Sequence, residues 1–412
     1  MVPMRSVADI YQDCLSNADQ QAPLDLLLLD AVGCVLAEDV VAIADYPASN
    51  VASRDGYALR AGDVAMATAL THVELPVTGE IRAGQAHAGG LAPNTAVRIA
   101  SGAPLPIGAD AVVALTDTDQ GESQVSVNVG VDVGDNVRLQ GEDIKLGRVV
   151  VPKRTRLGPP QIGAIAAAGH ARVLVHPRPR VVILSVGDEL VEPGSPPREG
   201  NVVDINGQAL VASASEVGAE TFHAVAVGDD RAALRQMIDD QLMRADLIVT
   251  TGGLSHGSGN TVRETLGSHG TVRFDTVSGQ PGAMLGVGTV SVEGDEATAT
   301  PIFCLPGDPV AAQVCFEVFV RPALRKMQGW KTLNRSSVKA RATFALQSPA
   351  GIREFLRVRI QGSPSSGYEA HALGDPKALW ISALASSNAL AVVPEEATSV
   401  PEGTLLTCML LD

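Results

Sequence analysis

Short apolar runs that each end in a polar, glycine-bearing turn stand out after residue 180. The segments read RVVILSVGDEL at 180–190, DLIVTTGGLSHG at 246–257 and FCLPGDP at 303–309. Runs rich in β-branched residues, with helical patterns between them, are typical of buried parallel strands. The carboxyl ends of such strands line the ligand crevice of an open α/β sheet. We therefore expect the first turn (185–190), the second turn (250–257) and the third turn (305–309) to converge on one site.

Strand and helix patterns alternate through residues 180–325. The predicted strands are 181–186, 221–227, 246–251 and 302–305, and the predicted helices are about 206–217, 230–244, 261–267 and 310–325. In the helix at 230–244, one side carries the apolar residues Leu234, Met237, Ile238 and Leu242. This alternation predicts a doubly wound parallel sheet with right-handed crossovers.

The rest of the chain favours strands and turns. A short helix is expected at 6–15, where Ser6 and Asp9 have capping-box spacing. Glycines punctuate 46–145, which predicts an inserted β domain, and strand-like segments after Gly329 predict a C-terminal, barrel-like β domain. We expect four domains, namely 1–45 with 146–179, then 46–145, 180–329 and 330–412.

Composition narrows the class of protein. Hydrophobic residues make up 45% of the chain and charged residues 19%, which is typical of a globular protein. The net charge of −15 argues against a general nucleic-acid or anionic-membrane surface. No apolar stretch approaches the ~20 residues of a membrane span, so no membrane insertion is expected. Five scattered cysteines without a CxxC pair predict buried free thiols and a reducing cytoplasm.

Acidic residues follow two neighbouring predicted strands. Asp188 and Glu189 come after the first strand, and Asp229 and Asp230 come after the second. Carboxylates in such a crevice suit Mg²⁺, which takes oxygen ligands and often bridges phosphates. Helix capping is the alternative for Asp229 and Asp230. Having two sets of acids on adjacent strand ends favours the metal site.

The second turn carries glycines and hydroxyls in the order TTGGLSHG. Its backbone N–H groups could cradle a phosphate, although such turns also serve simple chain reversal. For His256 alone, a loop or packing role is favoured over a ligand role. In the β domain, polar loops at 53–57, 101–106 and 138–143 could be turns only, or could together form a polar face opposite the α/β crevice.

A series of motifs runs in order along nearly the whole chain. They are DGYA at 55–58, SGAPLP at 101–106, GED at 141–143, SVGDEL at 185–190, VDIN at 203–206, TTGGLSHG at 250–257, LPGDPV at 305–310 and EFLRVR at 354–359. Through these motifs the chain resembles the molybdopterin molybdenumtransferase family, which has the C-terminal domain of gephyrin as a eukaryotic relative. Members of that family are the last enzyme of molybdenum cofactor assembly. In their reaction, adenylylated molybdopterin accepts molybdate, and AMP is released with the help of Mg²⁺.

The resemblance implies four subdomains and an elongated homodimer, with 1–45 and 146–179 as linker and dimerisation domain and with an active site in a cleft where two subunits meet. The sheet would be of molybdopterin-binding type. Carried over position by position, the catalytic residues are Asp55, Ser101, Asp143 and Asp229, and the metal residues are Glu189, Asp229 and Asn260. The substrate-binding residues are Ser185, Gly187, Thr251, Gly252, Gly253, Ser255, Pro306, Gly307 and Arg357. Ser101 stands where many members have threonine, which keeps the hydroxyl.

The chain departs from the family pattern at the metal and molybdate positions. Asn260 replaces an aspartate, and an amide is a poorer Mg²⁺ ligand than a carboxylate. Gln280 and Ala283 replace two lysines, and Asp308 adds a negative charge to the third turn. A like charge ~5 Å away costs about 3 kcal/mol per charge pair at an effective dielectric of 20, and molybdate is a dianion. Arg357, Lys377 or backbone amides could compensate, or Asp308 could point away or pair with an arginine.

Two functions therefore stay open. The first is molybdate insertion. The alternative is a catalytically impaired, gephyrin-like dimeric scaffold, whose dimer or C-terminal groove binds a membrane receptor or a tubulin-like filament or cell-division protein and gains avidity from its two sites. A Rossmann-type oxidoreductase is disfavoured because no GxGxxG motif follows a strand.

Overall fold

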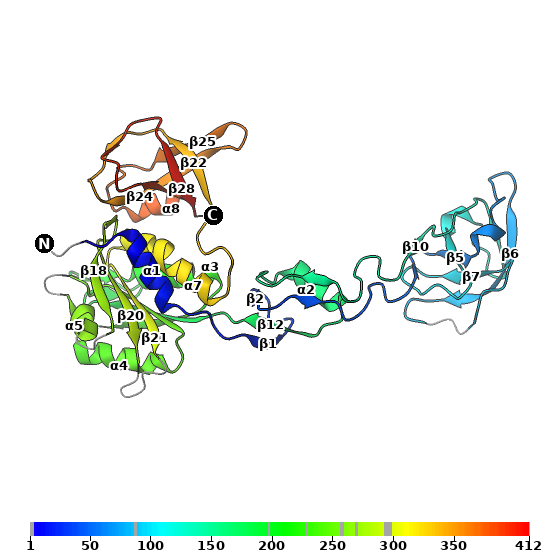
Figure 1. The fold of residues 1–412 in the computed structure, drawn as a ribbon, viewed down its shortest axis with the longest axis horizontal. Helices are drawn as coiled ribbons and strands as arrows, with labels where there is room; N and C mark the ends of the chain where they lie inside the picture. The colour runs from blue at the N-terminus through cyan, green and yellow to red at the C-terminus, as the bar shows by residue number, and fades with distance from the viewer. Residues whose placement is uncertain are drawn as a thin grey trace. The chain divides into compact units, whose positions relative to one another are not determined.

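The computed structural model describes residues 4–85, 89–196, 198–227, 230–255, 259–267, 271–291 and 299–411. They form two compact units, coloured along the chain in Figure 1. The first unit comprises Met1–Leu24, Gly33–Ala37 and Leu174–Asp412, and the second comprises Asp25–Val32 and Glu38–Val173. The division into four domains is finer than these units and stays a prediction.

The centre of the first unit is a six-stranded sheet in the order β16-β13-β17-β21-β20-β18. Its parallel strands are β13 (Arg180–Val186), β16 (Glu220–Val227), β17 (Leu247–Thr251) and β21 (Thr300–Leu305). All of them correspond to predicted strands. In the register, Val182 pairs with Ile248 and Val249 pairs with Phe303, so the strands end at the same edge. The predicted α/β fold class is confirmed.

Two strands at one edge of the sheet were not predicted from the sequence. β20 (Met284–Val290) runs antiparallel to β21, and β18 (Arg273–Thr276) runs antiparallel to β20. The sheet is therefore mixed rather than wholly parallel. β20 reads MLGVGTV, and glycines inside a strand weaken the pattern by which strands are recognised.

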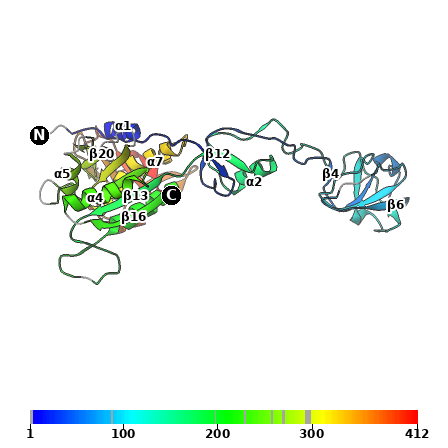
Figure 2. The same cartoon turned by 90° about the horizontal axis from the view of Figure 1, so that it is seen from below.

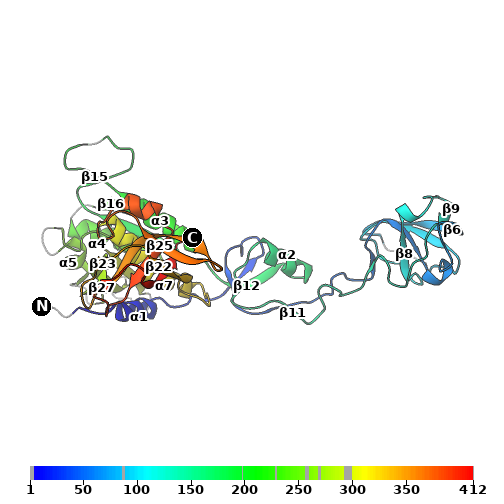
Figure 3. The ribbon, with the colours of Figure 1, turned by 90° about the horizontal axis from the view of Figure 1, so that it is seen from above.

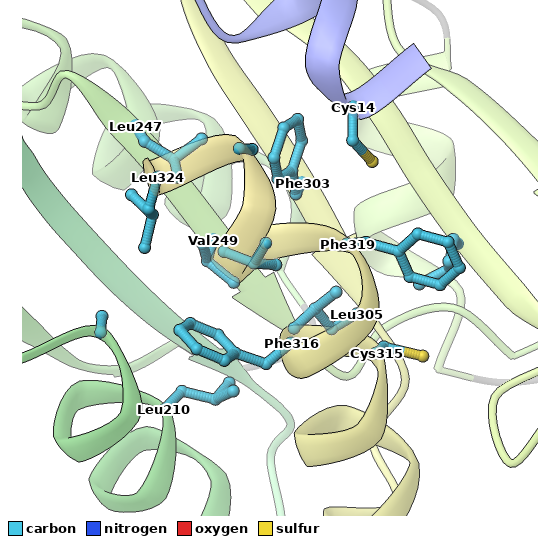
Figure 4. Packing of buried hydrophobic residues seen from close by; sticks show 14 of the residues in the cluster. Cys14, Leu210, Leu247, Val249, Phe303, Leu305, Cys315, Phe316, Phe319 and Leu324 are labelled. Atoms are coloured by element: carbon cyan, nitrogen blue, oxygen red, sulfur yellow. The ribbon is translucent and has the colours of Figure 1, made fainter. Parts of the chain in front are cut away.

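Helices cover both faces of the sheet. They are α1 (Val7–Asn17), α3 (Ile205–Val217), α4 (Arg231–Leu242), α5 (Thr261–Gly267), α6 (Pro309–Cys315), the π-helical segment Phe316–Val320 and α7 (Arg321–Met327). α1, α3, α6 and α7 share one apolar cluster with the sheet, in which Phe303 and Phe316 lie (Figure 4). α4 and α5 pack on the opposite face through residues such as Leu234 and Val262, and Figure 2 shows α4 beside β13 and β16.

The predicted N-terminal helix begins one residue after its cap. The hydroxyl of Ser6 accepts from Asp9 N at 3.1 Å, and Ser6 N donates to Asp9 Oδ2 at 3.3 Å. This reciprocal pair satisfies two backbone donors that a helix start leaves unpaired. Val7, Ile10 and Cys14 are buried, so one side of the helix faces the core.

The C-terminal part of the first unit is a closed β-barrel. Its strands are β22 (Ser337–Ala342), β24 (Arg353–Ser363), β25 (Gly367–Ala372), β26 (Ala389–Val393) and β28 (Leu405–Leu410). Pairing of β24 with β26 closes the ring, and Figure 3 shows β22 and β25 side by side. β19 (Gly279–Gln280) adds to β24 from the α/β domain, which joins the barrel to the sheet domain. The predicted barrel-like domain is confirmed; β25 and the helix α8 (Ile381–Ser386) were not predicted.

The second unit contains a five-stranded sheet in the order β8-β5-β7-β6-β9. These strands are β5 (Gly56–Leu59), β6 (Val73–Ile81), β7 (Ala96–Ile99), β8 (Ala111–Ala114) and β9 (Gln124–Val127). Two further strand pairs flank this sheet in the sequence: β3 (Val40–Val41) pairs with β11 (Val149–Val151), and β4 (Val51–Ala52) pairs with β10 (Val137–Arg138). The helix α2 (Pro159–Ala167) follows β11. A β domain at this point of the chain agrees with the sequence pattern.

The remaining short strands of the chain are β1 (Leu24–Leu27), β2 (Val35–Leu36), β12 (Arg172–His176), β14 (Leu190–Val191), β15 (Val202–Val203), β23 (Leu346–Gln347) and β27 (Ser399–Val400).

All five cysteines are buried and free, as expected. Burial raises the pKa of Cys304 and of Cys315 to about 12, so both stay protonated near neutral pH. In the described part of the chain, no helix has both the length and the apolar character needed to cross a membrane.

Candidate functional site

A cavity of about 670 Å³ lies where β13, β17 and β21 end. The three polar turns do converge there, because residues of each turn line it. The predicted site residues among its lining are Ser185, Gly187, Glu189, Thr251, Gly252, Gly253, Ser255, Pro306 and Gly307. Their roles stay predictions, although the parallel register explains why they meet.

Two glycines give the second turn its shape. Gly252 has φ +89°, and a Cβ there would lie 2.4 Å from Val186 O at the end of β13. Gly253 has φ +66°, and its Cβ would lie 2.6 Å from Val262 of α5. Both positions combine left-handed backbone with a close approach, so only glycine fits without strain. The turn is thereby pressed between the first strand and the next helix.

The donors of the second turn are only partly available to a ligand. Gly252 N donates to Leu305 O at 3.2 Å, and Ser255 N donates to Gly259 O at 3.1 Å. The N–H groups of Gly253 and Leu254 have no acceptor among the described residues. A phosphate cradle at this turn would therefore use those two groups, which narrows the expectation from the sequence.

Of the predicted metal residues that the structure describes, only Glu189 lies at the cavity where the strands end. The Glu189 carboxylate lies at the cavity and folds back over Gly187, where a Cβ would be 2.6 Å from Glu189 Oε2. Asn260 Nδ2 donates to Glu264 Oε1 at 2.7 Å, and Glu264 also pairs with Arg231. Asp229 lies outside the described residues. Among those that are described, no three His, Cys, Asp or Glu side chains converge to hold a metal.

Asp230 caps a helix, which is the alternative role that the sequence allows for it. Its Oδ1 accepts from Ala233 N at 2.7 Å at the start of α4. One Mg²⁺ ion commonly uses one or two carboxylates and completes its shell with substrate phosphates and water. Glu189, at the edge of the cavity, fits that requirement as a carboxylate ligand.

Sequence reasoning missed several residues of the same cavity. Asp204 and Asn206, from the VDIN motif, lie on its wall, and an apolar side is formed by Leu190, Val202, Val203 and Ile205. Val202 and Val203 are about half exposed, at 51% and 44%. The sequence did indicate that Asp204 begins a helix, because an Asp before a small-residue helix is a typical N-cap. What the sequence did not indicate is that the helix start faces the cavity.

A second cavity of about 270 Å³ lies between the α/β domain and the barrel. Gln280, Gly282 and Ala283 line one side, and Arg357 and Lys377 line the other. The two cavities are neighbours, because Ala283 lines the second and Met284, the next residue, lines the first. Arg357, predicted from the sequence to bind substrate, is therefore in this second cavity and not with the turns.

Arg357 is buried and partly committed to backbone acceptors. Its Nη2 donates to Pro376 O at 2.9 Å and also to Ala378 O, while Nε has no partner among the described residues. Burial lowers the pKa of the guanidinium, and the negative charges of Asp308 and Asp375 act in the opposite direction. The group remains a cation, and Nε remains as a donor for an anion.

Asp308 of the third turn has a structural partner. Its Oδ1 accepts from Ala311 N at 2.9 Å, and Asp308 is the N-cap of α6. The acid is near enough to act on the charge of Arg357. Among the described residues Asp308 forms no ion pair with an arginine, so its carboxylate serves as a helix cap while its charge acts on Arg357.

The predicted residues of the second unit form two groups. Ser101 N donates to Asp55 Oδ1 at 2.7 Å, so these two loops are held together. Asp143 lines a separate cavity of about 650 Å³ together with Tyr46 and Lys145, and it lies 3.8 Å from Arg138. No hydrogen bond or ion pair of the described residues joins Asp143 to Asp55 or Ser101. Whether this polar face meets the α/β crevice stays a prediction.

Three family models match consecutive parts of the chain. The "MoeA N-terminal region (domain I and II)" matches residues 4–169, the "Probable molybdopterin binding domain" matches 182–326, and the "MoeA C-terminal region (domain IV)" matches 339–411.

Relatives match over nearly the full length. Molybdopterin molybdenumtransferase 2 of Mycobacterium tuberculosis is 37% identical over 409 residues, covering 98% of this chain and 96% of the relative. Molybdopterin molybdenumtransferase 1 of the same organism is 36% identical, covering 98% of each chain. The solved structure of the molybdopterin biosynthesis moea protein from Pyrococcus horikosii is 27% identical, with a TM-score of 0.80 and coverage of 100% of both chains.

Proposed function

Because the chain belongs to the MoeA-type molybdopterin molybdenumtransferase family, we propose that it inserts molybdate into adenylylated molybdopterin and releases AMP, in molybdenum cofactor biosynthesis. One observation carries this proposal. A cavity with a glycine turn and a carboxylate neighbours a smaller cavity with a buried arginine, and the consecutive residues Ala283 and Met284 line the smaller and the larger one respectively. A reaction between a phosphate-bearing substrate and an oxyanion needs two such neighbouring sites.

The larger cavity suits the adenylylated molybdopterin. The N–H groups of Gly253 and Leu254 would bind a phosphate oxygen, with Thr251 and Ser255 beside them. The exposed apolar wall at Val202 and Val203 offers a surface for a flat heterocycle. Glu189 would hold Mg²⁺, with Asn260 and Asp229 as further proposed ligands. When bound, the ion neutralises phosphate charge and supports the departure of AMP.

The smaller cavity suits the oxyanion. Molybdate is a dianion and is bound by cationic and N–H donors, as phosphate is. Arg357 supplies a buried charge with Nε available, and Lys377 adds a second charge at the rim. Gln280 supplies a neutral amide where the family has lysine. Arg357 and Lys377 thereby offset part of the charge that the two lost lysines provided.

The second unit completes the proposal. Asp55 and Ser101, held together by their hydrogen bond, and Asp143 are proposed to act at the same reaction centre, from the partner subunit of a homodimer. Five buried free thiols fit a reducing cytoplasm, where we propose that the dimer works.

The test mixes the purified protein with adenylylated molybdopterin, Mg²⁺ and molybdate and follows the release of AMP. We expect release that depends on molybdate. Arg357→Met should raise the half-saturating molybdate concentration about tenfold or more, since a charge-assisted contact of about 1.5–3 kcal/mol is lost. Tight binding of the pterin nucleotide without any molybdate-dependent AMP release would sink the proposal.

A scaffold is the second candidate, and one observation favours it. Leu379, Trp380 and Ile381, at the start of α8, are 46%, 53% and 39% exposed and form an apolar strip beside the barrel. Such a strip can dock a protein segment, in the way expected for the tail of a membrane receptor or a tubulin-like protein. If this function holds, Trp380→Ala abolishes partner capture by the intact protein and leaves AMP release unchanged. Failure to recover a specific partner with the unaltered protein would exclude it.

A further inference from the structure

We propose that Asn206 is a positioning residue that holds the second and third turns at a fixed spacing, and so holds the wall between the two cavities in place. This inference deepens the proposed function, because that spacing sets where the pterin nucleotide and the oxyanion lie relative to each other. Asn206 belongs to the VDIN motif, to which no role was given from the sequence.

Asn206 connects the start of α3 to two strand ends through its amide nitrogen. Nδ2 donates to Thr251 Oγ1 at 2.8 Å and to Gly307 O at 2.8 Å. Thr251 Oγ1 in turn donates to Pro306 O at 2.8 Å. The side chain on α3 is thereby tied to the end of β17 and to the turn after β21. Gly252 N, which donates to Leu305 O, adds a backbone link between the same two turns.

The orientation of the amide follows from its partners. Gly307 O is a carbonyl and can only accept, so the atom facing it must be the NH₂ group. The hydroxyl of Thr251 donates its hydrogen to Pro306 O, so toward Asn206 the hydroxyl oxygen can only accept. Both hydrogens of Nδ2 are therefore used in the hydrogen-bond network of Asn206, Thr251, Pro306 and Gly307, which we call the clasp. Reversing the amide would set oxygen against oxygen at Gly307, so the arrangement is specific to asparagine.

The start of α3 is itself held firmly. Asp204 is the N-cap of α3, with Oδ1 accepting from Gly207 N at 2.8 Å, and it is only 2% exposed. Its other oxygen lies 3.2 Å from His223 Nε2 on β16. Asp204 N also donates to Val191 O at 2.9 Å. The asparagine therefore projects from an anchored helix end and can hold the turns in place.

The location of the clasp gives it a functional consequence. Pro306 and Gly307 line the larger cavity, and Pro306 lies against Gly282 of the smaller one, where a Cβ would be 3.4 Å from Pro306 Cγ. A shift of the third turn would change both cavities at once. A displacement of about 1 Å between reacting groups can cost about a hundredfold in rate.

The test compares isosteric variants. Asn206→Asp keeps the shape and one oxygen but removes both donors and turns a carboxylate oxygen toward Gly307 O. Asn388→Asp is the matched control, because Asn388 Nδ2 also donates to a backbone carbonyl, Ile360 O at 3.2 Å, in the barrel. Thr251→Val removes the hydroxyl that completes the clasp.

Amide hydrogen exchange of the free protein gives a readout that needs no turnover. In Asn206→Asp, peptides covering 247–255 and 305–311 should exchange at least about tenfold faster, while Asn388→Asp leaves both segments unchanged. Unchanged exchange at the third turn in Asn206→Asp overturns the inference. Because no substrate is present, this result is independent of whether the protein inserts molybdate.

Kinetics then separate positioning from plain stability. Asn206→Asp should lower kcat for molybdate-dependent AMP release about tenfold, with the Kd of the pterin nucleotide alone changed less than about threefold. The loss in the double variant with Thr251→Val should be smaller than the product of the single losses, because the two side chains share one network. A variant that keeps kcat and weakens both ligands equally would contradict positioning. An unaltered protein that releases no AMP would count against the proposed function only.

Discussion

Single residues decide where the chain can turn at the candidate site. Gly252 and Gly253 each combine positive φ with a close neighbour, and Asn206 combines a buried amide with two acceptor groups. The glycines could be recognised from the TTGG motif, whereas Asn206 could not. Its partners are 45 and 101 residues away along the chain, and nothing in local pattern links them.

Gly252→Ala tests the close approach at the second turn. The added methyl group would lie 2.4 Å from the backbone oxygen of Val186, which cannot rotate away. Gly259→Ala is the control, because Gly259 also has positive φ but has nothing within 4 Å of the added Cβ. Both changes carry left-handed strain of about 1–2 kcal/mol. Gly252→Ala should lose about 1–3 kcal/mol more, measured by denaturant unfolding; equal losses would contradict the crowded geometry.

Asn260→Asp tests whether the missing carboxylate limits the reaction. The change replaces an amide by a carboxylate, which is the better ligand if Mg²⁺ binds there, and Arg231, which pairs with Glu264, would balance part of the added charge. We expect the half-saturating Mg²⁺ concentration to fall about three- to tenfold, which corresponds to about 1 kcal/mol for a partly exposed charge pair, and the rate of AMP release to rise. Titration of Mg²⁺ in the AMP assay measures both. If turnover does not change, Asn260 is not what limits catalysis.

At the scale of elements, strand pairing and helix starts bring these residues together at one site. Parallel pairing of β13, β17 and β21 brings the three turns to one edge, and this much followed from the hydrophobic pattern. Helix starts then face the site with capping acids, namely Asp204 on α3 and Asp308 on α6. A cap and a functional acid look alike in sequence, since both follow a strand and precede a helix. Only the hydrogen bonds to Gly207 N and Ala311 N distinguish them.

Two substitutions separate the cap from the charge at Asp308. Asp308→Asn keeps a good N-cap, so the free energy of unfolding should change little, while Asp308→Ala should lose about 1 kcal/mol. Removing the negative charge near Arg357 should also lower the half-saturating molybdate concentration for Asp308→Asn. Thermal unfolding and the AMP assay give the two readouts. A rise in that concentration would mean that the acid supports Arg357 rather than competing with the oxyanion.

At the scale of the whole molecule, a buried ionic cluster ties the barrel linker to the α/β domain. Glu317 Oε2 accepts from Arg321 Nε and from Arg335 Nε, both at 2.6 Å. Glu216 pairs with the same two arginines but is 54% exposed. Arg335 precedes β22, so the cluster holds the chain where it enters the barrel. The sequence did not indicate this cluster, because its members come from three separate segments.

The two glutamates are expected to differ in their contribution to stability. Glu317→Gln leaves two buried arginines short of a charge partner and should cost about 3–5 kcal/mol. Glu216→Gln removes an exposed partner and should cost about 0–1 kcal/mol. Urea unfolding of the full chain measures both. Equal effects would mean that the cluster is more open to water than the structure indicates.

The five thiols offer a test of the packing of the first unit. Burial raises the pKa of Cys304 and Cys315 to about 12 and that of Cys408 to about 11, so these groups stay protonated in the folded protein. Ellman's reagent at pH 8 should find almost no thiol until the chain unfolds. Above about pH 9 the unfolded thiols ionise while the folded ones do not, so stability should fall as pH rises. Rapid reaction in the native state would contradict the burial.

The sequence by itself determined the α/β core, the presence of flanking β domains, the glycine turn and the position of Glu189 near a strand end, because strand period, turn chemistry and motif spacing are local properties. The antiparallel strands β18 and β20 were not predicted; β20 contains two glycines, which weaken the strand pattern. Only the tertiary structure decided that Arg357 lies in a neighbouring cavity, that Asp308 caps α6 and that Asn206 joins the turns. Those facts depend on contacts between residues far apart in the chain, which the folded backbone alone brings within hydrogen-bond distance.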